Sequence, residues 1–360
     1  MYFGLSEEQM FFQDNIKKFL SEQLSIDSIR NISNGDEKLK MEIHKGLLNL
    51  GINSLMVPEE YGGLGLDLLF GAAVSEGLGY GVATSPFIGS YVMAPLIISY
   101  GGNEKQKEAY LPKITSNDLT FAVGLSAYTG ARDNATIHIN KNEITGRSLF
   151  VYDSTYATHF LISDANGLIG VIDGSSKGVS KNHLKTIDKT RDLIEVCLDK
   201  ADINVLENTT NIDVINRVVD AGRIMLAADT LGCAQSMIDK SVDYAKERQQ
   251  FGRPIGSFQA VKHMCAEMCS DLEPCYSLVW HAAHSYSNFS DESRIMACHA
   301  KSHLSEVGKL IAKKSVEVHG GMGFTDLLGL HYWFKRIGLN RQLLGSPETT
   351  REVAAKIQLS

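Results

Sequence analysis

The sequence has few of the features that direct a chain to a membrane, to nucleic acid or to an oxidising compartment. No apolar run approaches the roughly 20 residues of a membrane helix, and the opening MYFGLSEEQMFF lacks the pattern of a secretory signal. Six cysteines form no CxxC pair and are too sparse for a disulfide scaffold. The formal net charge of −7 provides no excess of Lys and Arg. We therefore expect a soluble, cytoplasmic protein with reduced thiols and neither nucleic-acid nor membrane partners.

The 360 residues have an ordinary globular composition, and their hydrophobic rhythm changes twice. The first part has helical spacing and includes a helix that Asn103 should cap and Pro112 should stop. Short β-like runs follow, with a hairpin signal at Asn166-Gly167. Helical spacing then returns to the end. This order predicts an α+β fold with a helical domain at 1–117, a β-sheet or β-barrel domain at 118–205 and a helical bundle at 206–360.

Four stretches carry more information than this rhythm. They read VPEEYGGLGL, GNEKQKEAYLPKI, ERQQFGRPIGSFQAV and VEVHGGMGF, in that order. One short motif is weak, but four in a fixed order are specific. Together with the order of helices and sheet, they resemble the acyl-CoA dehydrogenase family over essentially the whole chain. The resemblance implies a flavoprotein that uses FAD to remove hydrogen from Cα and Cβ of an acyl-CoA. It also implies electron transfer to an electron-transferring flavoprotein.

The resemblance assigns the third stretch to an FAD that is held mainly by a neighbouring subunit. Arg248 would neutralise the pyrophosphate, because a guanidinium stays charged and can bind two phosphate oxygens. Phe251 would line the adenosine side, and Gln259 would form a hydrogen bond with the cofactor. A surface cation at a helix end is the plain alternative for Arg248.

The fourth stretch would contribute to the same nucleotide site. Gly320, Gly321 and Gly323 would let the backbone approach the nucleotide, because no Cβ intervenes. Glu317 stands where many relatives carry glutamine, so its contact with the cofactor is an open question at this point.

The pocket for the flavin ring departs from the family pattern. Relatives carry Thr-Glu-Pro, Gly-Ser-Asp and Trp-Ile-Thr or Trp-Ile-Ser, where this chain reads SAY, ARD and LFVYD. The partial matches are Ser126, Asp133, Phe150 and Tyr152. A phenyl ring at position 150 could shield one face of a flat group, but it cannot replace the lost hydrogen-bond donors.

The catalytic base of the family is also missing. The reaction needs a carboxylate to take the α-proton while the β-hydrogen leaves as hydride. Ungapped spacing from the glycine turn puts Leu344 at the usual glutamate position. Some relatives carry the base before an arginine that matches Arg223, a weak substrate-binding candidate, but Gly222 stands there. Glu348, one turn beyond Leu344 if the segment is helical, is a weak alternative, and Asp220 is weaker still.

A chain that keeps residues for a neighbour's FAD and loses its own base resembles the degenerate subunit of heteromeric α2β2 acyl-CoA dehydrogenases of steroid-degrading bacteria. We expect a base-lacking subunit with a homologous, glutamate-bearing partner. A self-sufficient enzyme that uses Glu348 and a flavin-free structural relative remain open. The acyl group is not set, although the heteromer resemblance favours a bulky one.

A helical metal protein is the rival from another class. His281 and His284, and His299 and His303, could share helix faces. Di-metal bundles require Glu-x-x-His ligand sets, which this sequence lacks. We therefore expect no metal.

Overall fold

The computed structural model describes residues 4–131, 135–287 and 290–359. The N-terminal part consists of helices whose central members, α4 and the π-helical turn η2, are almost entirely buried. Asn103 caps α6 as predicted, but the helix continues through Pro112 to Thr115. The missing proline N–H leaves only the carbonyl of Glu108 without its helical donor, and Glu108 is exposed to water. The elements are α1 (Glu7–Gln23), α2 (Ile26–Ser33), α3 (Glu37–Asn49), η1 (Glu59–Tyr61), α4 (Leu68–Tyr80), η2 (Phe87–Met93), α5 (Ala94–Gly101) and α6 (Glu104–Thr115).

The middle part is a curled sheet with strand order β6-β7-β3-β1-β4-β5-β8, and β2 pairs with β3. Only the β1–β4 pair is parallel among these described strands. The hairpin predicted at Asn166-Gly167 joins β4 to β5, and Gly167 has φ +91°. The elements are β1 (Phe121–Gly124), α7 (Ser126–Thr129), β2 (Ile137–Asn140), β3 (Glu143–Tyr152), β4 (His159–Ser163), β5 (Ile169–Asp173), β6 (Val179–His183), β7 (Leu193–Asp202), β8 (Asn204–Val205) and η3 (Glu207–Thr210).

Side chains on both faces of this sheet are buried. Phe121 and Val123 of β1 belong to the core shared with the helices. Ala122, between them, belongs to a second core inside the curled sheet, together with Phe160 and Ile162 of β4. This alternation is what a strand with apolar partners on both faces requires.

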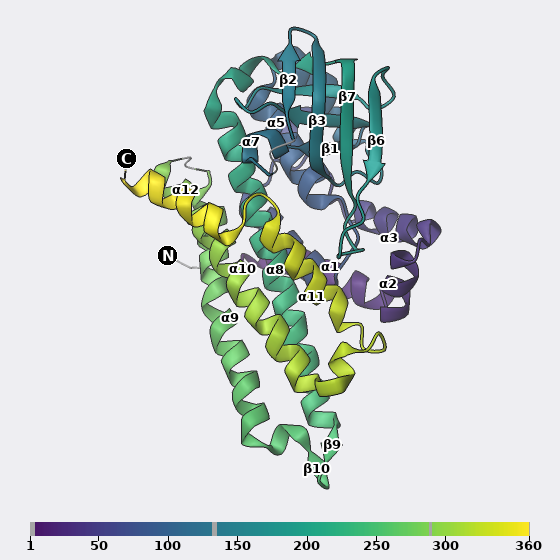
Figure 1. The fold of residues 1–360 in the computed structure, drawn as a ribbon, viewed down its shortest axis with the longest axis vertical. Helices are drawn as coiled ribbons and strands as arrows, with labels where there is room; N and C mark the ends of the chain where they lie inside the picture. The colour runs from purple at the N-terminus through teal and green to yellow at the C-terminus, as the bar shows by residue number, and fades with distance from the viewer. Residues whose placement is uncertain (1–3, 132–134, 288–289, 360) are drawn as a thin grey trace.

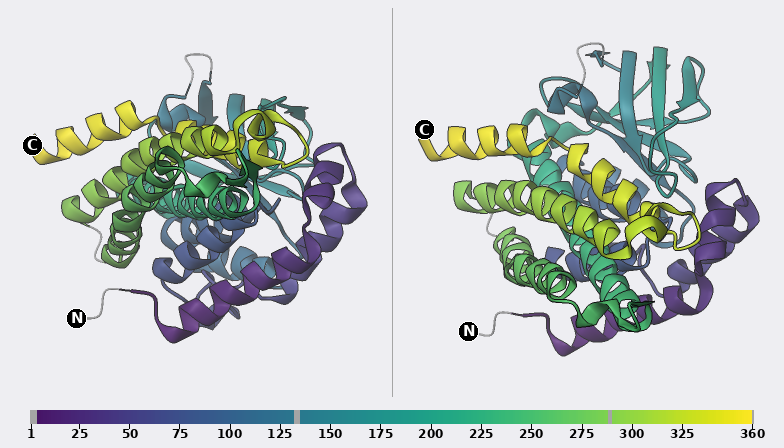
Figure 2. Two further views of the ribbon diagram at one scale, coloured as in Figure 1. Left: turned by 90° about the horizontal axis from the view of Figure 1, so that it is seen from below. Right: turned by 60° about the horizontal axis from the view of Figure 1, so that its bottom comes forward.

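The C-terminal part is built around the long helix α8, which packs against α4, α9, α10 and α11. Figure 1 shows α8 running from the sheet at the top to the β9–β10 hairpin at the bottom tip. Figure 2 shows α12 extending away from the sheet, with the C-terminus at its free end. The elements are α8 (Ile212–Glu247), β9 (Gln249–Gln250), β10 (Arg253–Pro254), η4 (Ile255–Ser257), α9 (Gln259–Ser285), α10 (Asp291–His319), η5 (Gly320–Phe324), α11 (Leu330–Gln342) and α12 (Pro347–Leu359). The predicted order of helices, sheet and helices is confirmed.

A buried ionic cluster ties the sheet to the helices. Asp229 of α8 accepts hydrogen bonds from Arg336 Nε at 2.9 Å and Nη2 at 2.6 Å, and from Asn340 Nδ2 at 2.6 Å. Arg191, in the loop between β6 and β7, places its Nη2 3.1 Å from the same carboxylate. Burial raises the pKa of Asp229, but the two guanidiniums outweigh it and hold the pKa well below its usual range. Three segments distant in sequence are therefore fixed at one point.

Candidate active site

A cleft of about 480 Å³ lies between the sheet and the last two helices. It brings together Ser126, Phe150, Tyr152 and Leu344, which are the predicted ring-pocket residues and one predicted base position. Its volume falls in the range of small-molecule sites. The lining residues are Leu125, Ser126, Thr129, Gly130, Ala131, Leu149, Phe150, Tyr152, Leu339, Gln342, Leu343, Leu344, Gly345, Ser346 and Thr349, none of which is charged. Asp133 lies outside the described residues.

The sheet side of the cleft is shaped by a bulge in β3. Its pairing with β7 shifts register between Ser148 and Val151, and Phe150 within the bulge has φ +51°. The bulge aligns the N–H of Leu149 with the Ser126 hydroxyl at 2.9 Å. The Ser126 hydroxyl oxygen therefore accepts a hydrogen bond from the chain's own backbone.

The opposite wall is the loop between α11 and α12, and three buried groups hold it. The N–H of Leu344 donates to the Tyr152 hydroxyl at 3.1 Å. Arg223 Nε donates to the Leu344 carbonyl at 3.1 Å, and Lys301 Nζ donates to the Gly345 carbonyl at 3.2 Å. Leu344 itself has φ +56°, a left-handed conformation that is unfavourable for leucine. Tyr152 and Arg223, which the sequence analysis gave as candidate site residues, therefore hold this loop in position.

Lys301 was not predicted from the sequence. It is 1% exposed, and its ammonium also donates to the Arg341 carbonyl at 3.1 Å and the Ser305 hydroxyl at 3.3 Å. It therefore caps the C-terminal end of α11, where free carbonyls favour a cation. Burial, followed by the nearby guanidiniums of Arg223 and Arg341, lowers its pKa to about 7. Helical spacing is the sequence signal that could have identified Lys301 as buried, because Leu304 and Ser305, at positions i+3 and i+4, are buried too.

The two predicted base positions lie against each other. A Cβ placed on Gly222 would lie 2.4 Å from Leu344 Cδ1 and 3.0 Å from Met93 Sδ. Helix α8 and the α11–α12 loop therefore converge at one point, and neither supplies a carboxylate there. The nearest acid on α8, Asp220, is 3% exposed and bonds Arg223 Nη1 at 3.1 Å. Burial raises its pKa to about 6, against the lowering effect of Arg223 and Arg294.

Glu348 is exposed and does not line the cleft. The condition for its lying one helical turn beyond Leu344 is not met, because Leu344 and Gly345 have φ +56° and +105° and α12 begins only at Pro347. Its carboxylate lies 3.1 Å from Arg341 Nη2. A hydrogen bond with Ser346, followed by smaller effects that include Arg341, lowers its pKa to about 2. Such a carboxylate is a weak proton acceptor at neutral pH.

The residues predicted to serve a neighbour lie at the other end of the molecule. Arg248 ends α8, Phe251 is 91% exposed at the turn of the β9–β10 hairpin, and Gln259 begins α9 with its side chain exposed. At 1.5 Å per residue, the 26 positions from Gly222 to Arg248 span roughly 39 Å of α8. Figure 1 shows the same separation, with the hairpin at the bottom and β3 and α7 at the top.

The three glycines of η5 differ in whether the packing and backbone conformation of the chain itself require a glycine at that position. A Cβ on Gly320 or Gly321 would meet no atom within 4 Å, whereas one on Gly323 would lie 2.8 Å from the Val316 carbonyl. Gly320 still requires its freedom for φ +58°. Gly321, by contrast, faces open space, so nothing within the described chain accounts for its missing side chain. Glu317 is exposed on the last turn of α10.

A flavin dinucleotide suits these two regions unequally. The tip offers an exposed guanidinium, an exposed phenyl ring and an open glycine, which match a pyrophosphate and its nucleoside. The cleft has room for a flat ring, but its Ser126 hydroxyl is already bonded within the chain. A single flavin dinucleotide cannot span the length of α8 between them. The tip therefore offers groups that suit the nucleotide half of an FAD, and the cleft lies too far away to hold the other half of the same molecule.

Within residues 4–131, 135–287 and 290–359, no helix is long and apolar enough to cross a membrane. In the same ranges, no three His, Cys, Asp or Glu side chains gather as a metal site would require.

The family model for the acyl-CoA dehydrogenase N-terminal domain matches residues 6–118, and that for the C-terminal domain matches residues 212–359. The caffeyl-CoA reductase-Etf complex subunit CarC of Acetobacterium woodii is 28% identical, over 90% of each chain. The ChsE4-ChsE5 complex of Mycobacterium tuberculosis matches all of both chains, with TM-score 0.89 and 23% identity. An acyl-CoA dehydrogenase complexed with FAD from Bacillus anthracis has TM-score 0.87 and 22% identity, over 99% of this chain and 68% of that one.

Proposed function

Because the chain belongs to the acyl-CoA dehydrogenase family, whose members are flavin-dependent oxidoreductases, we propose that it is the base-lacking subunit of a heteromeric acyl-CoA dehydrogenase. Its partner would be a homologous subunit that carries the catalytic glutamate. The pair would carry out α,β-dehydrogenation of an acyl-CoA thioester.

One observation carries the proposal. The two positions where this fold can present a base, Leu344 and Gly222, pack against each other without a carboxylate. The α-proton of a thioester is too weakly acidic to leave without a positioned base, and such assistance contributes about 10²–10⁴-fold. At the far end, Arg248 and Phe251 are exposed. The chain has thus lost what its own site needs and kept what a neighbour's site needs.

Bound FAD would supply the acceptor for the β-hydrogen. Arg248 would offset the pyrophosphate charge, with about 1.5–3 kcal/mol for each charge-assisted hydrogen bond. Phe251 would cover the adenosine, and Gln259 would add a hydrogen bond. Gly321 would let the backbone of η5 approach the nucleotide. Tyr152, Arg223 and Lys301 would keep the α11–α12 loop closed against the cleft, which excludes water from this end of the site.

Two alternatives receive less support. A self-sufficient enzyme would need Glu348 to leave Arg341, turn toward the cleft and accept a proton despite its low pKa. A flavin-free relative would have no use for an exposed arginine and phenylalanine beside an open glycine. Electrons would pass on to an electron-transferring flavoprotein, a partner supported by the relative CarC, which is a subunit of a caffeyl-CoA reductase-Etf complex. The ChsE4-ChsE5 likeness supports the heteromer.

The test compares flavin content and turnover in three samples. The chain alone, the glutamate-bearing homologue alone and the two co-expressed are each scanned for flavin absorbance and assayed by acyl-CoA-dependent reduction of an artificial acceptor. We expect both properties in the co-expressed pair and little or no turnover in the chain alone. Turnover by the chain alone that disappears with Glu348→Gln would establish the self-sufficient enzyme instead.

Arg248→Ala tests the contact across the interface, and Arg253→Ala is its matched control. Both arginines are exposed on the same hairpin, but the Arg253 guanidinium lies over the Phe258 ring, 4.1 Å from its centroid. We expect Arg248→Ala to weaken FAD retention by the pair at least tenfold and Arg253→Ala to change it less than threefold. Equal retention in the two variants would contradict the assigned role.

A further inference from the structure

The reaction dictates where an acyl chain would have to lie. The base must reach Cα while the flavin ring reaches Cβ. Under the proposed function, the thioester would pass between the base position and the ring cleft, and the rest of the acyl chain would continue past the base position toward the helices. In this chain that path leads from Leu344 toward the backbone of Gly222 on α8 and the Met93 side chain of η2, which lie next to each other.

Leu344 itself fills the start of this path. It is 4% exposed, and its Cδ1 occupies the space that a side chain at position 222 would need. Its left-handed backbone, held by the hydrogen bonds from Arg223 and to Tyr152, directs the side chain inward. Met93, which is fully buried, closes the space from the other side.

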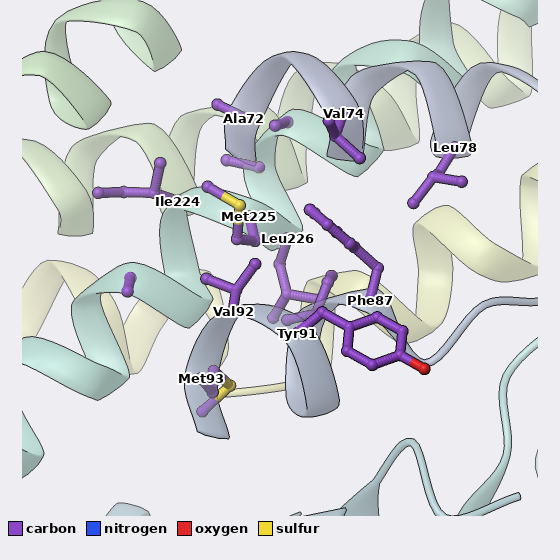
Figure 3. Close-up of a cluster of buried hydrophobic side chains, with 14 of the residues drawn as sticks. Ala72, Val74, Leu78, Phe87, Tyr91, Val92, Met93, Ile224, Met225 and Leu226 are labelled. Atoms are coloured by element: carbon purple, nitrogen blue, oxygen red, sulfur yellow. The ribbon is translucent and has the colours of Figure 1, made fainter. Parts of the chain in front are cut away.

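Beyond this contact the interior is packed. Figure 3 shows the side chains of η2, α4 and α8 meeting around Val92, Met225 and Phe87. Every residue labelled there is at most 2% exposed: Ala72, Val74, Leu78, Phe87, Tyr91, Val92, Met93, Ile224, Met225 and Leu226. The cavity beside the start of η2 holds about 10 Å³, the size of one water molecule, and Asp153 and Arg191 are among its lining residues. Neither the packing nor that cavity suits an acyl chain.

Resting on the proposed function, we infer that Leu344 is a plug that seals the acyl path, and that Gly222 is its complement. This subunit then binds no acyl chain, and the substrate of the complex lies entirely in the partner. The two lost bases become one coupled change, because the leucine that replaces the first occupies the space required by the second. A side chain at position 222 is therefore excluded while Leu344 is present.

A double-mutant cycle measures this complementarity without any cofactor or partner. Gly222→Ala should lower the folding equilibrium constant of the chain at least tenfold, because its Cβ meets Leu344 and Met93. In the Leu344→Ala background the same substitution should cost less than threefold. Gly338→Ala on α11 is the control, because a Cβ there meets no atom within 4 Å. Equal costs of Gly222→Ala in both backgrounds would overturn the plug.

Ligand binding measures its consequence. Calorimetric titration uses CoA and 3-thiaoctanoyl-CoA, a thioester with sulfur in place of the β-methylene, which therefore cannot be dehydrogenated. The chain alone should bind the two within twofold of each other, and the co-expressed complex should bind one 3-thiaoctanoyl-CoA per unlike pair. At least tenfold tighter binding of the thioester by the chain alone, or two sites per pair, would overturn the inference.

These results separate the inference from the proposed function. If no flavin-containing pair forms, the proposed function fails, while the cycle and the titration of the chain alone still decide the plug. If the pair is active but holds two acyl chains, the proposed function stands and the plug falls.

Discussion

Replacing Asp229 should show how strongly the buried ionic cluster holds the sheet against the helices. Asp229 is 1% exposed and faces the guanidiniums of Arg336 and Arg191. Asp229→Ala leaves both cations in the interior without their counter-charge. Breaking a buried pair in this way costs about 3–5 kcal/mol, and we expect the upper half of that range because two cations lose one partner.

The expected change in melting temperature follows from the chain length. At about 2.1 cal/mol/K of unfolding entropy per residue, each kcal/mol shifts the Tm of a chain of 360 residues by about 1.3 °C. Asp229→Ala should therefore lower Tm by about 5–7 °C. Differential scanning calorimetry measures the shift, and hydrogen exchange of residues 184–192 reports whether the Arg191 loop separates from the helices.

The matched control is Asp243→Ala on the same helix. The Asp243 side chain is 73% exposed and lies 3.7 Å from the exposed Lys246. Exposed pairs contribute about 0–1 kcal/mol, so Tm should change by about 1 °C or less. If Asp229→Ala cost less than about 1 kcal/mol, or no more than Asp243→Ala, the view of the cluster as a clamp between domains would be refuted.

Three further outcomes are expected. Tyr152→Phe removes the acceptor for a buried loop N–H and should cost about 1–3 kcal/mol by urea unfolding. Tyr156→Phe removes a buried hydroxyl for which the described part of the chain offers no partner, so a comparable loss there would contradict this reasoning. Burial raises the pKa of Asp153 from 3.8 to about 6, against the charge of a neighbouring guanidinium, so its stabilising contribution is complete below about pH 4 and lost by about pH 6. The unfolding free energy should therefore fall across that window by on the order of 3 kcal/mol more in the parent chain than in Asp153→Asn, and an equal fall in the two proteins would rule this source out. Gly321→Ala should leave Tm unchanged but weaken FAD retention by the assembled pair, whereas Gly323→Ala should destabilise the chain itself. The reverse pattern would contradict the assignment of the nucleotide to this end of the molecule.

The order of helices, sheet and helices could be predicted from the sequence alone, because helical and strand spacing are local patterns. Four motifs indicated the family, and ungapped counting from the glycine turn to Leu344, together with the arginine motif at Gly222, predicts that neither base position carries a carboxylate. Pro112 shows the limit of local rules. A proline costs one helical hydrogen bond, and the sequence does not reveal whether water can replace it.

Which of these positions contact one another depends on how the whole chain packs. Tyr152 and Leu344 are 192 residues apart, and Arg223 and Leu344 are 121 apart, yet they share hydrogen bonds. Lys301 caps the end of α11 only because the fold brings the Arg341 and Gly345 carbonyls within hydrogen-bond distance of its ammonium. Such contacts depend on how distant elements pack, and no local spacing encodes them. For the same reason the sequence predicts that two base positions lack a carboxylate, whereas the contact between Leu344 and position 222 is visible only in the packed structure.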